Sequence, residues 1–275
     1  MNMTAPDATA FLADWRIDFD ELRAFVRPIH DGETLLLVGS IADGLANELS
    51  DIDLLLLGSG SLERRDAVVD VNCEYATTVM KGHEVHVECW HPDVIDRLVA
   101  RMTAALDSFD DTGRFEPDQS LDDDRLCLLS RIRNGVVVAG ADAAAGWRGR
   151  CQSHRLPLYL RQHWLHGFRT LRSKALAEGR YGHPGSAQQQ FRGASVCLVG
   201  ALLCTIGETN TYSKWRPRLL QRHRDTIGAE TTDVMLRSLF APRMTASEMA
   251  TAFGLLDQIE HDVVSAARLS GLTSP

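Results

Sequence analysis

The chain has 275 residues, of which 44% are hydrophobic and 24% charged, a composition that supplies a core and excludes extended disorder. Lys and Arg number 29 against 37 Asp and Glu, and the net charge of −8 argues against a protein that grips many phosphates of a nucleic acid. Small molecules are therefore the expected partners, cationic ones above all, and nucleic acid is not expected.

No segment of the sequence predicts a membrane or secretory protein. The first residues lack a basic region followed by an apolar core, and no apolar run approaches the roughly 20 residues that span a bilayer. The six cysteines form no Cys-x-x-Cys pair, so they predict free buried thiols and neither a zinc site nor a disulfide framework. We therefore expect a cytoplasmic protein with no membrane partner.

In chain order, the first half alternates helical and strand patterns. Residues 11–29 have apolar side chains at helical spacing, which predicts one or two helices. Residues 35–38 and 54–57 are short apolar runs flanked by turn formers, so we expect two strands buried on both faces, joined by one short helix. A short helix over residues 62–69 and a hairpin with strands near 71–80 and 84–90 should follow, and Pro92 begins a further helix.

The second half reads as helical throughout. A polar, acidic stretch over residues 107–125 predicts a boundary between a first domain of residues 1–115 and a helical domain of residues 116–275. Its acidic run from Asp122 to Asp124 is interpreted as the capped start of a helix, not as a metal site. Helices are expected over residues 126–138, 147–177, 187–206, 217–226, 231–240 and 246–269. The predicted fold is an α/β (α+β) domain with a small mixed sheet, followed by an all-α helical bundle.

Polar residues mark the ends of the two buried strands. Gly39-Ser40 closes the first strand and opens the short helix, where free backbone N–H groups and the helix dipole suit a phosphate. The second strand begins with Ser50-Asp51-Ile52-Asp53, and alternation along a strand turns Asp51 and Asp53 to the same side. Two carboxylates facing a helix N-terminus predict a site for a hard divalent cation that holds a nucleoside triphosphate.

This arrangement resembles the nucleotidyltransferase superfamily that includes DNA polymerase beta and the aminoglycoside and lincosamide nucleotidyltransferases. Its members share Gly-Ser, a short helix and an apolar-flanked Asp-x-Asp that usually follows a Ser. Ala42 and Gly44 also match the small-molecule members. One residue departs from the pattern: Asp43 stands where many members carry an Arg, which either weakens a phosphate contact or reflects a different grip on the donor.

The resemblance implies a magnesium-dependent transferase that moves a nucleoside monophosphate, AMP from ATP, onto a small-molecule acceptor with release of pyrophosphate. On this reading Asp51 and Asp53 hold Mg²⁺, while Gly39, Ser40 and Ser50 bind the nucleotide. The helical domain would form the other wall of the cleft and set the acceptor.

The resemblance also implies a third acidic residue on a neighbouring strand. Glu84, His86 and Glu88 alternate with two valines, so the polar set shares one face and the valines face the core. Glu88 is the favoured catalytic metal ligand because a carboxylate suits Mg²⁺ better than an imidazole does, with Glu84 and His86 as the other candidates. A merely solvated polar face is the alternative. The general base is Glu88, Glu84 or a carboxylate of the helical domain.

A loop in the helical half concentrates aromatic and basic residues. Tyr212, Lys214 and Trp215 lie between two predicted helices. The segment resembles a Lys-Trp element that some superfamily members carry after the corresponding long helix, which implies that Lys214 reaches the triphosphate, with Tyr212 beside it. The alternative is an ordinary solvated lysine.

Three other functions compete with this reading. A protein-adenylylating antitoxin is disfavoured because stand-alone antitoxins are shorter. A non-catalytic nucleotide-binding protein is disfavoured by the intact Asp51 and Asp53. A polymerase that tails nucleic acid is disfavoured by the negative net charge.

Overall fold

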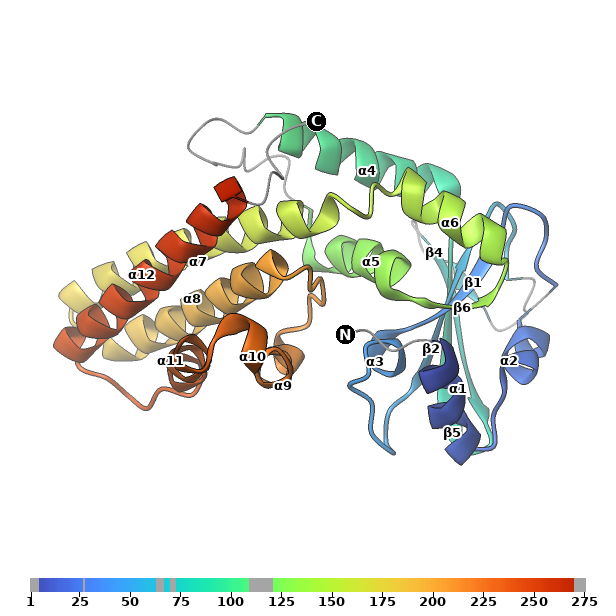
Figure 1. The fold of residues 1–275 in the computed structure, drawn as a ribbon, viewed down its shortest axis with the longest axis horizontal. Helices are drawn as coiled ribbons and strands as arrows, with labels where there is room; N and C mark the ends of the chain where they lie inside the picture. Colours follow the sequence, from blue (N-terminus) through green and yellow to red (C-terminus); the bar gives the residue numbers. More distant parts are fainter. Residues whose placement is uncertain (1–4, 27, 63–66, 70–72, 109–120, 270–275) are drawn as a thin grey trace. The chain divides into compact units, whose positions relative to one another are not determined.

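The computed structural model describes residues 5–26, 28–62, 67–69, 73–108 and 121–269 (Figure 1). The chain divides into two compact units, one made of residues 1–103 and 121–154 and the other of residues 104–120 and 155–275. The boundary expected between residues 115 and 116 lies outside the described residues. Residues 121–154 belong with the sheet because they supply its last strand.

The first unit is built on a six-stranded mixed sheet with the strand order β3-β4-β5-β2-β1-β6. The strands are β1 (Thr34–Val38), β2 (Ile52–Leu57), β3 (Val68–Val69), β4 (Cys73–Met80), β5 (His83–Trp90) and β6 (Val136–Ala139). β2 runs parallel to β5, and the other neighbouring pairs are antiparallel. The expected mixed sheet is therefore confirmed, as is the hairpin, whose turn residues Lys81 and Gly82 both have positive φ.

The two faces of the central strands have different surroundings. One face carries Ile52, Leu54 and Leu56 of β2 and the two valines of β5, and it packs against α1 (Ala5–Asp14) and α2 (Phe19–Phe25). The expected orientation of Val85 and Val87 toward the core is thereby confirmed. The opposite face therefore holds the polar residues of β5 and the acidic start of β2.

One predicted helix is wrong in its second half. Residues 126–138 were expected to be helical, whereas α5 (Asp123–Asn134) ends before Gly135 and β6 pairs antiparallel with β1. A Cβ atom at Gly135 would lie only 2.8 Å from the carbonyl oxygen of Arg131, so the chain turns where a glycine permits it. The three following valines are β-branched and favour the strand.

Two other expectations need correction. Val68 and Val69, expected in a helix over residues 62–69, form β3 and pair with β4, while residues 63–66 lie outside the described residues. The helix expected over residues 147–177 is two helices, α6 (Ala141–Arg150) and α7 (Leu156–Arg180), because the chain turns at Gln152, where φ is +47°. Similarly, residues 217–226 are divided between α9 (Arg216–Arg222) and α10 (Arg224–Ile227).

Asp122 caps α5 as expected, because its side chain accepts a hydrogen bond from the backbone N–H of Arg125 at 3.0 Å. The helix expected from Pro92 is α4 (Pro92–Asp107). The short helix between the first two strands is α3 (Gly39–Ala42).

The second unit is helical, as the sequence predicts. α7 packs along α8 (Pro184–Thr205), and α11 (Ala229–Leu239) and α12 (Ala246–Leu269) pack against this pair. Phe191 and Phe253 meet edge to face at 5.0 Å between α8 and α12. Two arginine–carboxylate ion pairs join α7 to α12, Arg169 with Glu260 and Arg172 with Asp257.

All six cysteines are free, and all but the half-buried Cys73 are buried, as expected. Burial raises the pKa of the Cys151 thiol to about 12, which keeps it unreactive at neutral pH. Among the described residues, no helix is both long enough and apolar enough to cross a membrane.

Candidate metal and nucleotide site

Gly39 and Asp53 approach each other more closely than any side chain at residue 39 would allow. Gly39 has a φ of +71°, and a Cβ atom built on it would lie 2.1 Å from Asp53 Oδ2. Glycine is needed here for both reasons, since it adopts positive φ without penalty and leaves room for the carboxylate. The pairing of Val38 with Asp53 across β1 and β2 produces this approach. The turn after the first strand and the acidic start of the second strand therefore meet at one place.

Ser50 is held in a turn just before β2. Its hydroxyl oxygen accepts the backbone N–H of Asn47 at 2.9 Å, and its own N–H donates to the Asn47 carbonyl at 3.0 Å. This turn delivers Asp51 to the sheet as an exposed residue one position before the strand starts. A nucleotide-binding role for Ser50 stays a prediction, and its contacts here support the loop.

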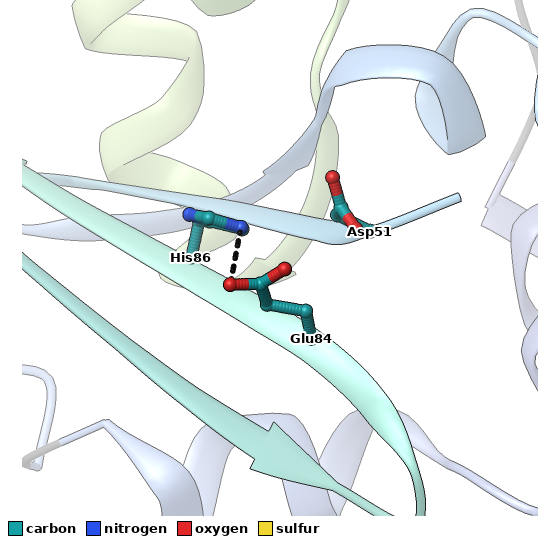
Figure 2. Close-up of side chains that lie close together, drawn as sticks. All are labelled: Asp51, Glu84 and His86. Atoms are coloured by element: carbon teal, nitrogen blue, oxygen red, sulfur yellow. Dashed lines mark ion pairs between the residues drawn. The ribbon is translucent and has the colours of Figure 1, made fainter. Parts of the chain in front are cut away.

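Asp51, Glu84 and His86 form a trio on the polar face of the sheet (Figure 2). One ligand atom from each residue lies within 4.8 Å of the other two. Asp51 comes from the start of β2, and the other two alternate along β5, so their side chains share one side of that strand. Oxygen and imidazole ligands that share a divalent cation lie about 3–4 Å apart, so small side-chain rotations would close the trio around an ion.

Glu88 is engaged elsewhere. Arg131 Nη1 donates to Glu88 Oε1 at 2.7 Å, and Trp90 Nε1 donates to Glu88 Oε2 at 3.0 Å. Both oxygens of this carboxylate therefore have a donor within the protein. Its assignment as the third metal ligand stays a prediction, and the geometry favours Glu84 over it.

Strand register explains why Glu84 is the nearer acid. Ile52 pairs with Val85 and Asp53 pairs with His86 in the parallel ladder of β2 and β5. Asp51 precedes this first pair, so Glu84 is the acidic residue of β5 closest to it in register. Glu88 lies opposite Leu55, further along the strand.

The electrostatics of this face favour a bound cation. Burial raises the pKa of the Asp53 carboxyl above its ordinary value, and the negative charges of Glu88 and Asp51 add to that effect. Arg131 and His86 act in the opposite direction but do not cancel the effect of burial. A divalent cation beside these carboxylates would therefore stabilise their ionised forms.

A family model described as nucleotidyltransferase domain matches residues 19–102. This part of the chain is a nucleotidyltransferase domain. The match contains Gly39, Asp53 and all three members of the trio, so the resemblance inferred from the sequence is confirmed at the level of the superfamily.

Other comparisons add little to this family assignment. No curated protein matches the chain. Among solved structures, the chain is similar to a nucleotidyltransferase-like protein from Exiguobacterium sibiricum 255-15. The identity is 13% and the TM-score 0.45, over 95% of this chain and 77% of that one. A similarity at this level carries no argument about function.

The predicted Lys-Trp element belongs to the second unit, outside the matched nucleotidyltransferase domain. Lys214 lies in a short 3₁₀ helix, η2 (Ser213–Trp215), and its side chain is exposed. The Lys214 ammonium lies 5.1 Å from the centre of the Trp215 ring and 5.7 Å from that of Tyr212. Both rings lie within cation–π distance of the lysine, and its contact with a triphosphate stays a prediction.

Sequence reasoning missed two residues of the nucleotidyltransferase domain's polar face. Arg131 reaches Glu88 from α5, and Thr77 Oγ1 of β4 lies 3.3 Å from His86 Nδ1. Thr77 could have been found from the hairpin, because strand pairing sets it opposite His86. Arg131 gives no such signal, since it is one of several basic residues on a helix expected to lie in another domain.

Proposed function

We propose that the chain is a divalent-metal-dependent nucleotidyltransferase that moves a nucleoside monophosphate, AMP from ATP, onto a small-molecule acceptor. The observation that carries the proposal is the contact of Gly39 with Asp53 inside a matched nucleotidyltransferase domain. It joins the glycine turn to the carboxylates, and these are the two parts that such a transfer needs in one site.

The residues present fit a divalent cation. Asp51 and Glu84 offer carboxylate oxygens and His86 offers a ring nitrogen, all within 4.8 Å. Burial raises the pKa of the nearby Asp53 carboxyl, and a cation beside it would stabilise its ionised form. A divalent cation held here would supply positive charge that offsets the negative charge developing on the phosphates during transfer. Asp51 and Glu84 would hold it, with Asp53 next to them.

The reaction exchanges a phosphoanhydride bond for a phosphoester bond. An acceptor oxygen forms a bond with the α-phosphorus of the donor, and the bond from that phosphorus to the oxygen bridging to the β-phosphate breaks. The bridging oxygen leaves as part of pyrophosphate, and the proton of the acceptor passes to a carboxylate. Glu88 is our candidate for this base, because it lies on the same face outside the trio and Arg131 holds its orientation.

The acceptor we propose is a small cationic molecule. The exposed members of the trio and the net charge of −8 both favour a positively charged ligand over a nucleic acid. Lys214, which lies near the rings of Tyr212 and Trp215, is proposed to meet the negatively charged donor.

Two labels on the donor test the proposal. The protein is incubated with a divalent metal, a panel of small acceptors or candidate protein acceptors, and ATP labelled on either the α- or the γ-phosphate. The proposal predicts that α-label enters a small acceptor and that γ-label appears in pyrophosphate. Transfer of γ-label to the acceptor would indicate a kinase, and α-label in a protein would indicate an adenylylating enzyme, and either result would contradict the proposal.

A further inference from the structure

The trio contains a histidine whose two ring nitrogens have different surroundings. His86 Nδ1 lies 3.3 Å from Thr77 Oγ1, and His86 Nε2 lies 3.6 Å from Glu84 Oε1 (Figure 2). His86 is half-buried, and β4 and β5 fix its position because Thr77 and His86 are directly paired. The ring is therefore held in place from its Nδ1 side, and its Nε2 side faces the carboxylates.

This division is the one that a metal-binding imidazole uses. A ligating histidine commonly donates its other N–H to an oxygen atom, which fixes the tautomer and aims the free lone pair at the ion. Thr77 Oγ1 lies within hydrogen-bond distance of Nδ1, which leaves Nε2 as the ring nitrogen that faces Glu84. A cation placed between His86 Nε2 and Glu84 Oε1, which lie 3.6 Å apart, would be bound by both atoms.

A third group distinguishes His86 from an ordinary surface pair. His91 and Asp93 show the same histidine–carboxylate separation of 3.6 Å, but they are two residues apart in one segment and belong to no trio. At His86 a second carboxylate, Asp51, approaches from the neighbouring strand. Three groups that converge from two strands form a partial coordination shell, which the His91 pair lacks.

We propose that His86 is a direct ligand of the metal in this site, together with Asp51 and Glu84, and that its nitrogen makes the site select Mn²⁺ over Mg²⁺. The inference rests on the proposed function, because it concerns the metal of the same site. Mg²⁺ prefers oxygen ligands in strict octahedral geometry and keeps much of its water. Imidazole suits first-row transition metals better than Mg²⁺, and Mn²⁺, the weakest binder of that series, is the member that also shares the preference of Mg²⁺ for carboxylate oxygens. Magnesium, expected from carboxylates alone, is thus the weaker choice for this trio.

Metal binding is tested first without nucleotide, acceptor or turnover. Mn²⁺ is titrated into the full-length protein and followed by electron paramagnetic resonance, and Mg²⁺ is then added as a competitor. We expect Mn²⁺ to bind at least about tenfold more tightly than Mg²⁺, and His86→Asn to weaken Mn²⁺ binding by about 10- to 100-fold with little effect on Mg²⁺. His91→Asn is the matched control and should bind Mn²⁺ as the unmodified protein does.

The ligand itself is identified by pulsed electron paramagnetic resonance, which detects nitrogen bound to Mn²⁺. We expect a nitrogen coupling in the unmodified protein and in His91→Asn, and none in His86→Asn. In His86→Asp a carboxylate oxygen replaces the ring nitrogen, so the metal preference of the site should move back toward Mg²⁺. A variant that fails to fold could not show this reversed preference.

Each contrary result overturns the inference. Absence of Mn²⁺ binding, a bound ion without nitrogen coupling, or a coupling that persists in His86→Asn would leave His86 and Glu84 as a plain ion pair. The proposed function fails in a different way, through absence of α-label transfer by a protein that shows the nitrogen-coupled ion. The two claims can therefore be rejected separately.

Discussion

At the scale of single residues, Gly39 is a position where one added methyl group should strongly reduce stability and activity. Gly39→Ala adds one methyl group that must occupy the position of Asp53 Oδ2 at a positive φ. Left-handed strain of about 1–2 kcal/mol and overpacking of about 1–3 kcal/mol together predict a loss of stability of about 2–5 kcal/mol. Thermal or urea unfolding measures this loss, and nucleotidyl transfer should fall with it.

Gly82→Ala is the control for backbone strain. Gly82 also has a positive φ, of +90°, but nothing lies within 4 Å of an added Cβ atom. Its replacement should therefore cost only the strain of about 1–2 kcal/mol and leave transfer intact. Equal losses of stability in the two variants would show that the contact of Gly39 with Asp53 is not tight.

Substitutions of Glu84 and Glu88 should change different quantities, metal affinity for the first and kcat for the second. Glu84→Gln removes a charge from the trio and is expected to weaken metal binding by at least about tenfold. Glu88→Gln removes the candidate base and should lower kcat by about 100-fold or more while metal affinity stays nearly unchanged. Calorimetry with the metal and steady-state kinetics give the two values. A larger loss of metal affinity in Glu88→Gln would restore Glu88 as the ligand, as the sequence first indicates.

The polar face was predictable in part from the sequence. Alternation placed Glu84, His86 and Glu88 on one side of a strand, and the structure agrees because the valines between them are buried. Which acid lies nearest Asp51 depends on the register of two parallel strands that are about 30 residues apart in the chain. Local pattern does not fix such a register, since it is set by the packing of the whole sheet.

At the scale of elements, η2 presents one lysine between two aromatic rings. Lys214→Ala should weaken ATP binding by about tenfold and leave acceptor binding unchanged, because only the donor carries three phosphates. Lys174→Ala on α7 is the control, an exposed lysine of the same unit. Calorimetric titration with ATP separates the two variants, and unchanged affinity in Lys214→Ala would assign the residue to solvated surface.

α7 carries a buried and poorly compensated positive charge. Arg161 is 3% exposed, its Nε has no hydrogen-bond partner among the described residues, and burial lowers its pKa. Replacing a poorly compensated buried charge by an apolar side chain of similar volume is often stabilising by about 1–4 kcal/mol. Arg161→Met should therefore raise the free energy of unfolding in urea, whereas Arg180→Met, at the exposed end of the same helix, should change it little. A destabilised Arg161→Met protein would contradict the account.

Elements were predicted well where one pattern dominates. The hairpin, the capped start of α5 and the helices of the second unit follow from alternation, turn residues and helical spacing. β6 was missed because Gly135 alone separates its four residues from α5, and only pairing with β1 makes them a strand. The short β3 is likewise defined by its partner β4 and not by its own two valines.

At the scale of the whole molecule, composition and length predicted a hydrophobic core and two units. They did not predict which segments of the chain belong to each unit. Residues 121–154 return to the sheet after the chain has entered the second unit, which adds β6 beside β1 and places Arg131 of α5 against Glu88. From the sequence alone, residues 121–154 look like the start of the helical half, because α5 is helical up to Asn134.

The central claim is that Asp53, packed against Gly39, belongs to a metal-dependent nucleotidyl transfer site. Its most direct test is the rate of pyrophosphate release by Asp53→Asn with a saturating divalent metal, ATP and an accepted acceptor. The account predicts a fall of at least about 100-fold, because the amide keeps the shape but loses the charge. Asp14→Asn, which removes an exposed carboxylate at the end of α1, should retain full activity. Near-normal metal-dependent turnover in a folded Asp53→Asn protein would contradict the claim.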